Sequence, residues 1–550
     1  TIKNLSFGTE NGKDYDDVST ITSNSSDGVS RTAVIQTVVP ESSLTLSNVR
    51  NFAHINTAKS AGVTSYAAGL CAEWKGTGEA SAVGNYGDVT VTEQAGSTTS
   101  LSIAGGVCAV SAGGAKFKDC VNAGKIENAG GSNKNTVNYS AGILGQMTAV
   151  AGSINSCSNS GRLVNSMAQS QKFYAGGIVG VIEKGTSVSS CSNTADLLQS
   201  MPVSFAYFAG IAGSVDGTSL KISGCRNSGR ICNTGFVSGT SGNLRMAGVV
   251  ANPKGGTSGV QIENCENSGV VSNVSETAQP CMGGIVGSNT STPVSIEGCK
   301  NNKNAAITSV CRTSATLTQC NLGGIIGISS ANGAKYSSCE NYSDVTLQTV
   351  GLTTLAEVGG IVGRTGNCTI SGCKSVSRIS VSSATTLEAG CIAGRVGASS
   401  TIKASGIGGK LVGTDITSSN WMQKISGVNG IITTDGGPES CYFIESTPET
   451  AITVKIGSFN LWRPLSRISD RSTYPEISEY RLWEHAVGGI AQTIKNMDCD
   501  IIGFVELYST TETTPYVDTN KELVSLTNSL TDNRYTWRLQ FPNKADGSYT

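Results

Sequence analysis

A short glycine signature recurs along most of this 550-residue chain and limits the folds that are open to it. Each copy has a small residue, one or two glycines and then aliphatic residues, as in AGGIVG at 175–180 and LGGIIG at 322–327. The equivalent position in the ten copies falls at residues 69, 106, 142, 177, 210, 248, 284, 324, 360 and 391. The steps between them are 31 to 40 residues, a period near 36. Ten regular copies predict a repeat architecture rather than one compact core.

A second signature, Cys-x-Asn, occurs between successive glycine signatures, as in CRNSGRI at 225–231. The cysteines of this signature are Cys120, Cys157, Cys191, Cys225, Cys265, Cys299, Cys339 and Cys373. The asparagines that follow are Asn122, Asn159, Asn193, Asn227, Asn267, Asn301 and Asn341. We expect the cysteines to be buried free thiols, because disulfides need Cβ atoms about 3.8 Å apart, closer than stacked parallel strands place them. We expect the asparagines to form a turn ladder that bonds neighbouring repeats, with sugar binding as the alternative.

The segments between these signatures are short, β-prone and bounded by Gly, Asn and Ser, which predicts a parallel β-helix, or β-solenoid, of about ten coils. Equivalent residues of successive coils would lie about 4.8 Å apart, with Ile, Val and Leu stacked inside. Helical repeats are disfavoured because long helix-forming runs are rare here. The net charge of −1 gives no global field for nucleic acid or anionic membranes, and we expect no membrane-spanning segment, since no apolar run approaches about 20 residues.

The glycine signatures resemble the GLUG motif of large secreted and surface proteins of bacteria, over residues from about 60 to 410. The resemblance implies a β-solenoid and an extracellular or cell-surface location, including a lipid-anchored position on the outer membrane. It implies no chemistry. Partners through the solenoid would be other surface proteins or glycans.

The character of the sequence changes near residue 430. We interpret 1–60 as N-terminal coils or a cap, 61–429 as the repeats, 430–451 as a linker and 452–550 as the start of another domain. In that domain, ITVKIGSFNLW at 452–462 and DIIGFVEL at 500–507 predict strands. The segment 475–497 between them has the apolar period of a helix. This order of elements predicts an α/β layout after the mainly β solenoid.

SFNLW, the Arg-Leu-Trp-bearing helix and DIIGFVEL together resemble the opening of the endonuclease/exonuclease/phosphatase family, which has the DNase I-like fold. The resemblance implies an incomplete DNase I-like sandwich that hydrolyses phosphoesters, such as nucleic acids, nucleotides or other phosphate esters. Asn460 matches the family's first-strand asparagine near the metal, and Glu506 its metal-binding and catalytic glutamate. The metal would be Mg²⁺, or Mn²⁺ or Ca²⁺, which prefer such oxygen ligands.

The family also relies on a downstream Asp-x-Asn element, a catalytic histidine and a terminal Asp-His pair, and the chain contains no Asp-His pair. Its two histidines, His54 and His485, fall in the solenoid and on the predicted helix. We therefore expect the domain to continue beyond Thr550 and the chain as given not to catalyse. Two alternatives to a surface phosphoesterase stay open. One is a non-catalytic adhesin or assembly scaffold with a degenerate α/β domain. The other is a carbohydrate-active β-helix, which the scattered Asp and Glu of 60–410 disfavour.

Overall fold

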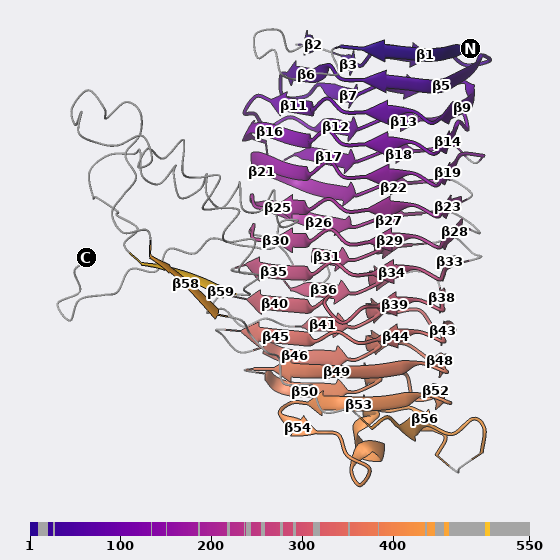
Figure 1. The fold of residues 1–550 in the computed structure, drawn as a ribbon, viewed down its shortest axis with the longest axis vertical. Coiled ribbons are helices and arrows are strands. Elements are labelled where there is room, and N and C mark those ends of the chain that lie inside the picture. The colour runs from indigo at the N-terminus through magenta and orange to yellow at the C-terminus, as the bar shows by residue number, and fades with distance from the viewer. Residues whose placement is uncertain are drawn as a thin grey trace, which may run out of the picture. The chain divides into compact units, whose positions relative to one another are not determined.

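The computed structural model describes most of residues 1–445 and two short segments beyond, 456–460 and 501–505. The undescribed residues within the first range are 9–19, 26–27, 134, 150, 185–186, 217–219, 236, 238–243, 255–258, 276–278, 290–292, 312–318, 350–352, 383 and 435–436. The chain divides into two compact units, Thr1–Ser446 and Thr447–Thr550. The first is a parallel β-solenoid, as the repeat predicted. Figure 1 shows its strands in layers from β1 (Ile2–Phe7) downward.

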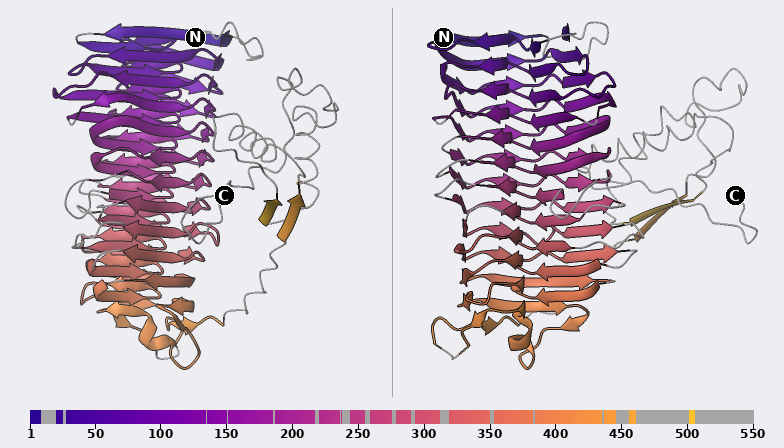
Figure 2. Two further views of the ribbon diagram at one scale, coloured as in Figure 1. Left: turned by 90° about the vertical axis from the view of Figure 1, so that its left-hand side faces the viewer. Right: turned by 180° about the vertical axis from the view of Figure 1, so that it is seen from behind.

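One turn of the solenoid contains five short strands. In a central turn they are β23 (Ser187–Ser189), β24 (Ser192–Asn193), β25 (Leu197–Gln199), β26 (Val203–Ala209) and β27 (Ala212–Val215). Each strand pairs in parallel with the equivalent strand of the next turn, and Figure 2 shows the same layers from two further sides. The hydrogen bonds therefore run between turns, and each turn alone could not bury its apolar face.

Two strand columns flank the glycine signature. The column before it contains β3 (Val29–Thr32), β7 (Thr64–Ala68), β12 (Ser100–Gly105), β17 (Thr136–Ala141), β21 (Leu163–Gly176), β26, β31 (Leu244–Ala247), β36 (Pro280–Gly283), β41 (Cys320–Gly323), β46 (Thr353–Gly359) and β50 (Ala384–Gly390). The column after it contains β4 (Ile35–Val38), β8 (Cys71–Trp74), β13 (Cys108–Ser111), β18 (Leu144–Met147), β22 (Val179–Ile182), β27, β32 (Val250–Pro253), β37 (Val286–Asn289), β42 (Ile326–Ser329), β47 (Val362–Thr365), β51 (Ala393–Arg395) and β55 (Ser426–Val428). The second column has 12 strands, because β4 and β55 add a layer at either end of the ten signature copies.

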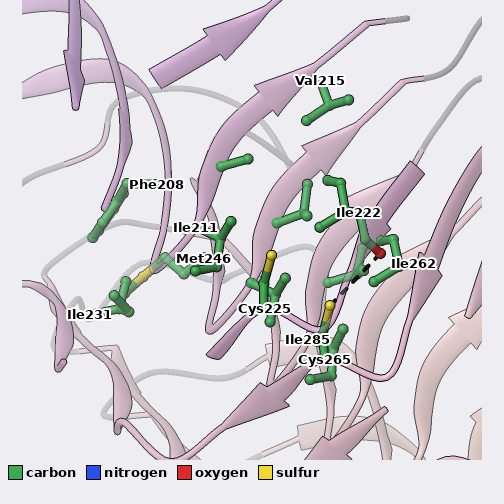
Figure 3. Close-up of a cluster of buried hydrophobic side chains, with 14 of the residues drawn as sticks. Phe208, Ile211, Val215, Ile222, Cys225, Ile231, Met246, Ile262, Cys265 and Ile285 are labelled. Atoms are coloured by element: carbon green, nitrogen blue, oxygen red, sulfur yellow. Dashed lines mark hydrogen bonds between the residues drawn. The ribbon is translucent and has the colours of Figure 1, made fainter. Parts of the chain in front are cut away.

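The interior is a continuous column of aliphatic side chains and thiols. Figure 3 shows Cys225 and Cys265 among isoleucines of neighbouring turns, with the Cys265 thiol 3.8 Å from the Ile222 carbonyl oxygen. Each thiol in the column also lies near the carbonyl two residues before it, for example 3.3 Å between Cys157 Sγ and the Asn155 oxygen. All eight cysteines of the second signature are buried and free, which confirms the prediction for them.

The asparagines of the second signature form the predicted ladder between turns. Asn193 donates one Nδ2 hydrogen bond to the Asn227 side-chain oxygen of the next turn at 2.8 Å, and another to the Ala195 carbonyl. The pattern starts earlier than predicted, with Asn51 and Asn85, and runs to Asn341. These amides are at most 1 % exposed, so the ladder stabilises the turns and is not presented to a ligand.

The glycine signature and the asparagine ladder contact each other within a turn. At Gly177 an added Cβ would collide with the Gly210 carbonyl oxygen and the Asn193 amide group. The same clash recurs at Gly284 with Asn301. The glycine is therefore required because the asparagine side chain occupies the space that a Cβ would need.

The last described turns of the solenoid extend from the predicted repeats, 61–429, into the predicted linker, 430–451. A 3₁₀ turn covers Trp421–Lys424, and β53 (Gly406–Leu411) pairs with β57 (Tyr442–Phe443). Another terminal pair joins β52 (Thr401–Lys403) to β56 (Ile431–Ile432). The solenoid pairing thus reaches Phe443.

The second unit contains two described strands, β58 (Ile456–Asn460) and β59 (Ile501–Val505), which pair in parallel. Both fall inside the segments that the sequence predicts as strands. The predicted helix at 475–497 lies outside the described residues, so the α/β layout stays a prediction.

Candidate functional sites

Of the two residues predicted to bind metal, Asn460 is the last residue of β58, a strand that pairs with β59. In the β58–β59 ladder, Asn460 is the partner of Val505. Glu506 follows Val505 directly in the sequence and lies outside the described residues. Because the strands are parallel, their carboxyl ends meet at the same edge of the sheet. This pairing is what a site shared by Asn460 and Glu506 requires.

The donor chemistry of this pair suits a hard divalent cation. A carboxylate and a side-chain amide offer the oxygen ligands that Mg²⁺ prefers, and the ion keeps several waters when a protein supplies so few ligands. Within the described part of the chain, no three His, Cys, Asp or Glu side chains gather where they could hold a metal ion. The metal hypothesis therefore depends on the second unit.

His54 forms a hydrogen bond between two turns of the solenoid. It begins β6 (His54–Lys59), is half-buried, and its Nδ1 accepts the backbone N–H of Asp88 at 3.2 Å. The other histidine, His485, lies outside the described residues.

The structure also brings together side chains that the sequence analysis did not single out. Residues seven apart stand on either side of the glycine signature, in the two flanking strand columns, and some of these pairs are in contact, as Glu357 is with Arg364 and Glu388 with Arg395. We call this set the corner. Its members before the glycines include Tyr139, Tyr174, Tyr207, Arg245, Glu357 and Glu388, and those after them include Gln146, Ser214, Asn252, Arg364 and Arg395. The repeat offset was the available signal, since each member stands at a fixed distance from the motif.

Aromatic rings occupy the middle of the corner. Tyr174 contacts Tyr139 and Tyr207 edge-to-face, with ring centroids 5.4 and 5.1 Å apart. The Arg245 guanidinium lies 4.6 Å from the Tyr207 ring centroid. Burial raises the pKa of Tyr174, and the neighbouring tyrosines add to the effect. Tyr139 and Tyr174 keep part of their surface exposed, so this stretch combines apolar rings with a cation.

Carboxylates and guanidinium groups occupy the C-terminal part of the corner. Glu357 is fully buried and accepts the Asn321 amide at 2.5 Å. Arg395 lies 3.1 Å from Glu388 and 3.8 Å from Glu357. Burial raises the pKa of Glu388, Arg395 opposes the shift, and Glu357 adds to it. Glu357 is fully buried and Glu388 is 7 % exposed. The two carboxylates therefore pair with side chains of neighbouring turns and leave little surface for a substrate.

Comparisons with known proteins leave both resemblances as expectations: no family model, curated protein or solved structure matches the chain. Among the helices of the described residues, none has the length and apolar character needed to cross a membrane.

Proposed function

We propose that the protein is a metal-dependent phosphoester hydrolase whose catalytic unit begins near Ile452 and is carried by a repeat solenoid. The observation that carries the proposal is the parallel pairing of β58 and β59, with Asn460 beside the residue that precedes Glu506. Parallel neighbours bring the two motif ends to one sheet edge, where ligands of α/β proteins commonly bind.

Asn460 and Glu506 would hold one Mg²⁺, or Mn²⁺ or Ca²⁺, with water completing the coordination. When bound, the ion would stabilise the charge that grows on a phosphoryl oxygen. Glu506 would hold the ion by its carboxylate, and Asn460 would contribute its side-chain oxygen from the end of β58. Nucleic acids, nucleotides and other phosphate esters are all candidate substrates.

The solenoid would serve as a spacer or docking platform on a secreted or cell-surface protein, including one anchored by lipid to an outer membrane. Two features support this role. The asparagine ladder and the apolar column tie the turns into one continuous element, and the repeat resembles motifs of bacterial surface proteins. Treatment of intact source cells with a protease tests the location: loss of the protein from intact cells is expected, and full protection would contradict a surface position.

Hydrolysis of a chromogenic phosphodiester tests the catalytic proposal. The protein should be isolated from its native source, so that whatever accompanies residues 1–550 is present, and the variants expressed in that source. We expect Mg²⁺-dependent turnover that Glu506→Ala lowers by about 100-fold or more, because removing a charge that holds the metal weakens transition-state stabilisation. Glu512→Ala, another glutamate of the same unit, is the matched control and should keep its activity. Full activity in Glu506→Ala would overturn the site assignment.

A second candidate function is binding without catalysis, as an adhesin or scaffold. It is favoured by the partly exposed rings of Tyr139 and Tyr174 beside Lys172, whose Nζ lies 5.5 Å from the Phe205 ring centroid. Aromatic faces next to a cation are common at binding surfaces for glycans and proteins. Glycan-array binding that Tyr174→Ala removes, and that Tyr342→Ala preserves, would support this function over hydrolysis.

A further inference from the structure

A lysine, a glutamate and an asparagine meet in the interior of the solenoid near its N-terminal turns. Lys59 ends β6, Glu93 ends β11 (Val89–Glu93), and the two are partners in the ladder. Asn133 comes from the following turn, where it bridges to Gly96. The side chains of Lys59 and Glu93 are 0 % exposed, and Asn133 is fully buried. We call these three residues the buried triad.

The Glu93 carboxylate lies between the amine and the amide. Its Oε2 is 3.1 Å from Lys59 Nζ, and its Oε1 accepts Asn133 Nδ2 at 2.6 Å. Two hydroxyls, Ser100 Oγ at 2.6 Å and Thr136 Oγ1 at 2.9 Å, also donate to Oε1. One carboxylate therefore contacts both a potential nucleophile and the nitrogen of a carboxamide.

The surroundings favour an uncharged amine and a polarised amide. Burial lowers the pKa of Lys59, although Glu93 opposes the shift, and a neutral amine is the nucleophilic form. The Asn133 side-chain oxygen accepts the backbone N–H of Asn135 at 3.1 Å. That hydrogen bond would stabilise negative charge on the oxygen if the carbonyl carbon were attacked.

We propose that Lys59 and Asn133 form an intramolecular isopeptide bond, with Glu93 as the catalytic residue. Lys59 Nζ attacks Asn133 Cγ, Glu93 takes a proton from Nζ and delivers it to Nδ2, and the Cγ–Nδ2 bond breaks. An Nζ–Cγ amide bond replaces the primary amide, and one ammonia leaves. The reaction exchanges one amide for another, so it needs no oxidant, reductant or cofactor.

The competing possibility is an ordinary buried ion pair. Lys59 Nζ also donates to the Val63 carbonyl at 2.8 Å and to Ser100 Oγ at 3.1 Å, which would satisfy an ammonium group. The two possibilities differ in covalent structure. An isopeptide bond would join turns two apart and would close a loop from residue 59 to 133, which constrains the unfolded chain.

The intact mass of the full, denatured chain separates them. Isopeptide formation predicts a mass lower by about 17 Da than the sequence mass, the mass of one ammonia. It also predicts that trypsin leaves Lys59 uncut and releases peptide 51–75 linked to peptide 126–134. A mass equal to that of the sequence in the folded wild-type protein would overturn the proposal, whatever the variants do.

Variants identify the reacting groups. Lys59→Met removes the amine and Glu93→Gln removes the proton acceptor, so each should show its full sequence mass and no linked peptide. Lys125→Met, at the surface pair with Glu127, is the matched control and should keep the loss. If the mass loss persists in Lys59→Met, the ammonia is lost without a bond to Lys59, as in a cyclic imide at an asparagine, and the isopeptide proposal is wrong. A linked peptide in Glu93→Gln would overturn the role given to Glu93.

Discussion

At the scale of single residues, the turns of the solenoid are joined by a ladder of buried asparagines whose amides bond to one another. Asn227 accepts a hydrogen bond from Asn193 at 2.8 Å and donates to Asn267 and to the Gly229 carbonyl, both at 2.9 Å. A buried polar group is tolerated when every partner is present and is costly when one is removed. The ladder is therefore a sequence of mutually dependent sites.

Replacing one ladder residue should destabilise the solenoid. Asn227→Ala leaves the Asn193 amide and the Asn267 oxygen without their buried partner, and we expect a loss of about 1–3 kcal/mol in the free energy of unfolding. Asn302→Ala, which removes a surface hydrogen bond to Ser268, is the control and should cost less than about 0.5 kcal/mol. Urea denaturation followed by circular dichroism measures both. Equal effects of the two variants would contradict the structural role of the ladder.

The buried thiols predict a loss of stability at high pH. Burial raises the pKa of Cys281 to about 11 from a usual value of 9.0. Below about pH 9 the folded and unfolded states both hold the proton. Between about pH 9 and 11 the unfolded thiol ionises while the folded one does not, so stability falls as pH rises, by about 1.4 kcal/mol for each pKa unit.

Cys281→Ala should therefore flatten the decline of unfolding free energy over that pH range. Ser288→Ala, at the residue seven positions on across the corner, removes a side-chain group that does not titrate and is the control. Denaturation series at pH 8, 9, 10 and 11 test this. An unchanged slope in Cys281→Ala would show that other groups govern the alkaline transition.

Some of these residues could be predicted from the sequence and others could not. Cys225 and Asn227 have counterparts at the same positions in most turns, so their stacking could be predicted from spacing alone. The triad of Lys59, Glu93 and Asn133 could not be predicted, because each residue belongs to a different turn and none recurs. The positions of Glu357 and Arg364 in the corner recur in each turn, but most turns have other residue types there. The sequence therefore did not reveal that these two side chains form an ion pair.

At the scale of the turn, the backbone restricts the residue type at two positions. One has a left-handed conformation, and the other has no space for a Cβ. The residue before each signature cysteine has a positive φ, such as 52° at Ser156, 61° at Gly224 and 52° at Asn264. The motif glycine faces the asparagine of its own turn. In the last copy, Cys391 replaces that glycine and Ile407 stands at the ladder position, so both partners change together.

These two positions should respond differently to substitution. Gly284→Ala introduces a Cβ against the Gly324 carbonyl and the Asn301 amide, and we expect a loss of roughly 3 kcal/mol. Gly224→Asn should cost less than about 1 kcal/mol, because nothing lies within 3.5 Å of a Cβ there and asparagine tolerates the left-handed region. Thermal unfolding of both variants tests the contrast. A tolerated Gly284→Ala would contradict the packing of glycine against the ladder.

Strand order within a turn could be predicted only coarsely from the sequence. The solenoid and its period followed from the ten copies, but strands as short as Ser192–Asn193 have too few residues to show an alternating pattern. Their strand character arises from pairing with the same residues in adjacent turns, such as Asn193 with Asn227. In the second unit, the alternation of 452–462 and the apolar run of 500–507 predicted the two strand segments, and their parallel pairing agrees with the α/β hypothesis.

At the scale of the whole molecule, a solenoid should accept the removal of a complete turn. Deleting residues 194–227 removes one period of 34 residues. Asn193 then directly precedes Ser228 and takes the place of Asn227, its partner in the ladder. We expect the strand content per residue to be kept and unfolding to stay cooperative, since each turn contacts only its neighbours. Deleting residues 194–210 removes half a turn, shifts the ladder out of register and should abolish folding. Equal behaviour of the two deletions, measured by circular dichroism and calorimetry, would contradict the nearest-neighbour account.

The division of labour between the two units is the central claim about function. The solenoid supplies a long element without a metal-holding cluster among its described side chains, and the second unit supplies the paired strand ends at Asn460 and Val505. The functional hypothesis came from two short motifs, and the parallel register is the structural observation that agrees with it.

The most direct test of that claim is a crystal structure of the full chain grown with Mn²⁺, in which anomalous scattering locates the ion. The account predicts a single strong peak coordinated by Glu506, beside the end of β58 at Asn460, which disappears in Glu506→Ala while the solenoid is unchanged. A peak bound elsewhere, or Mn²⁺ bound equally well by Glu506→Ala, would contradict a metal-dependent hydrolase site at these strand ends.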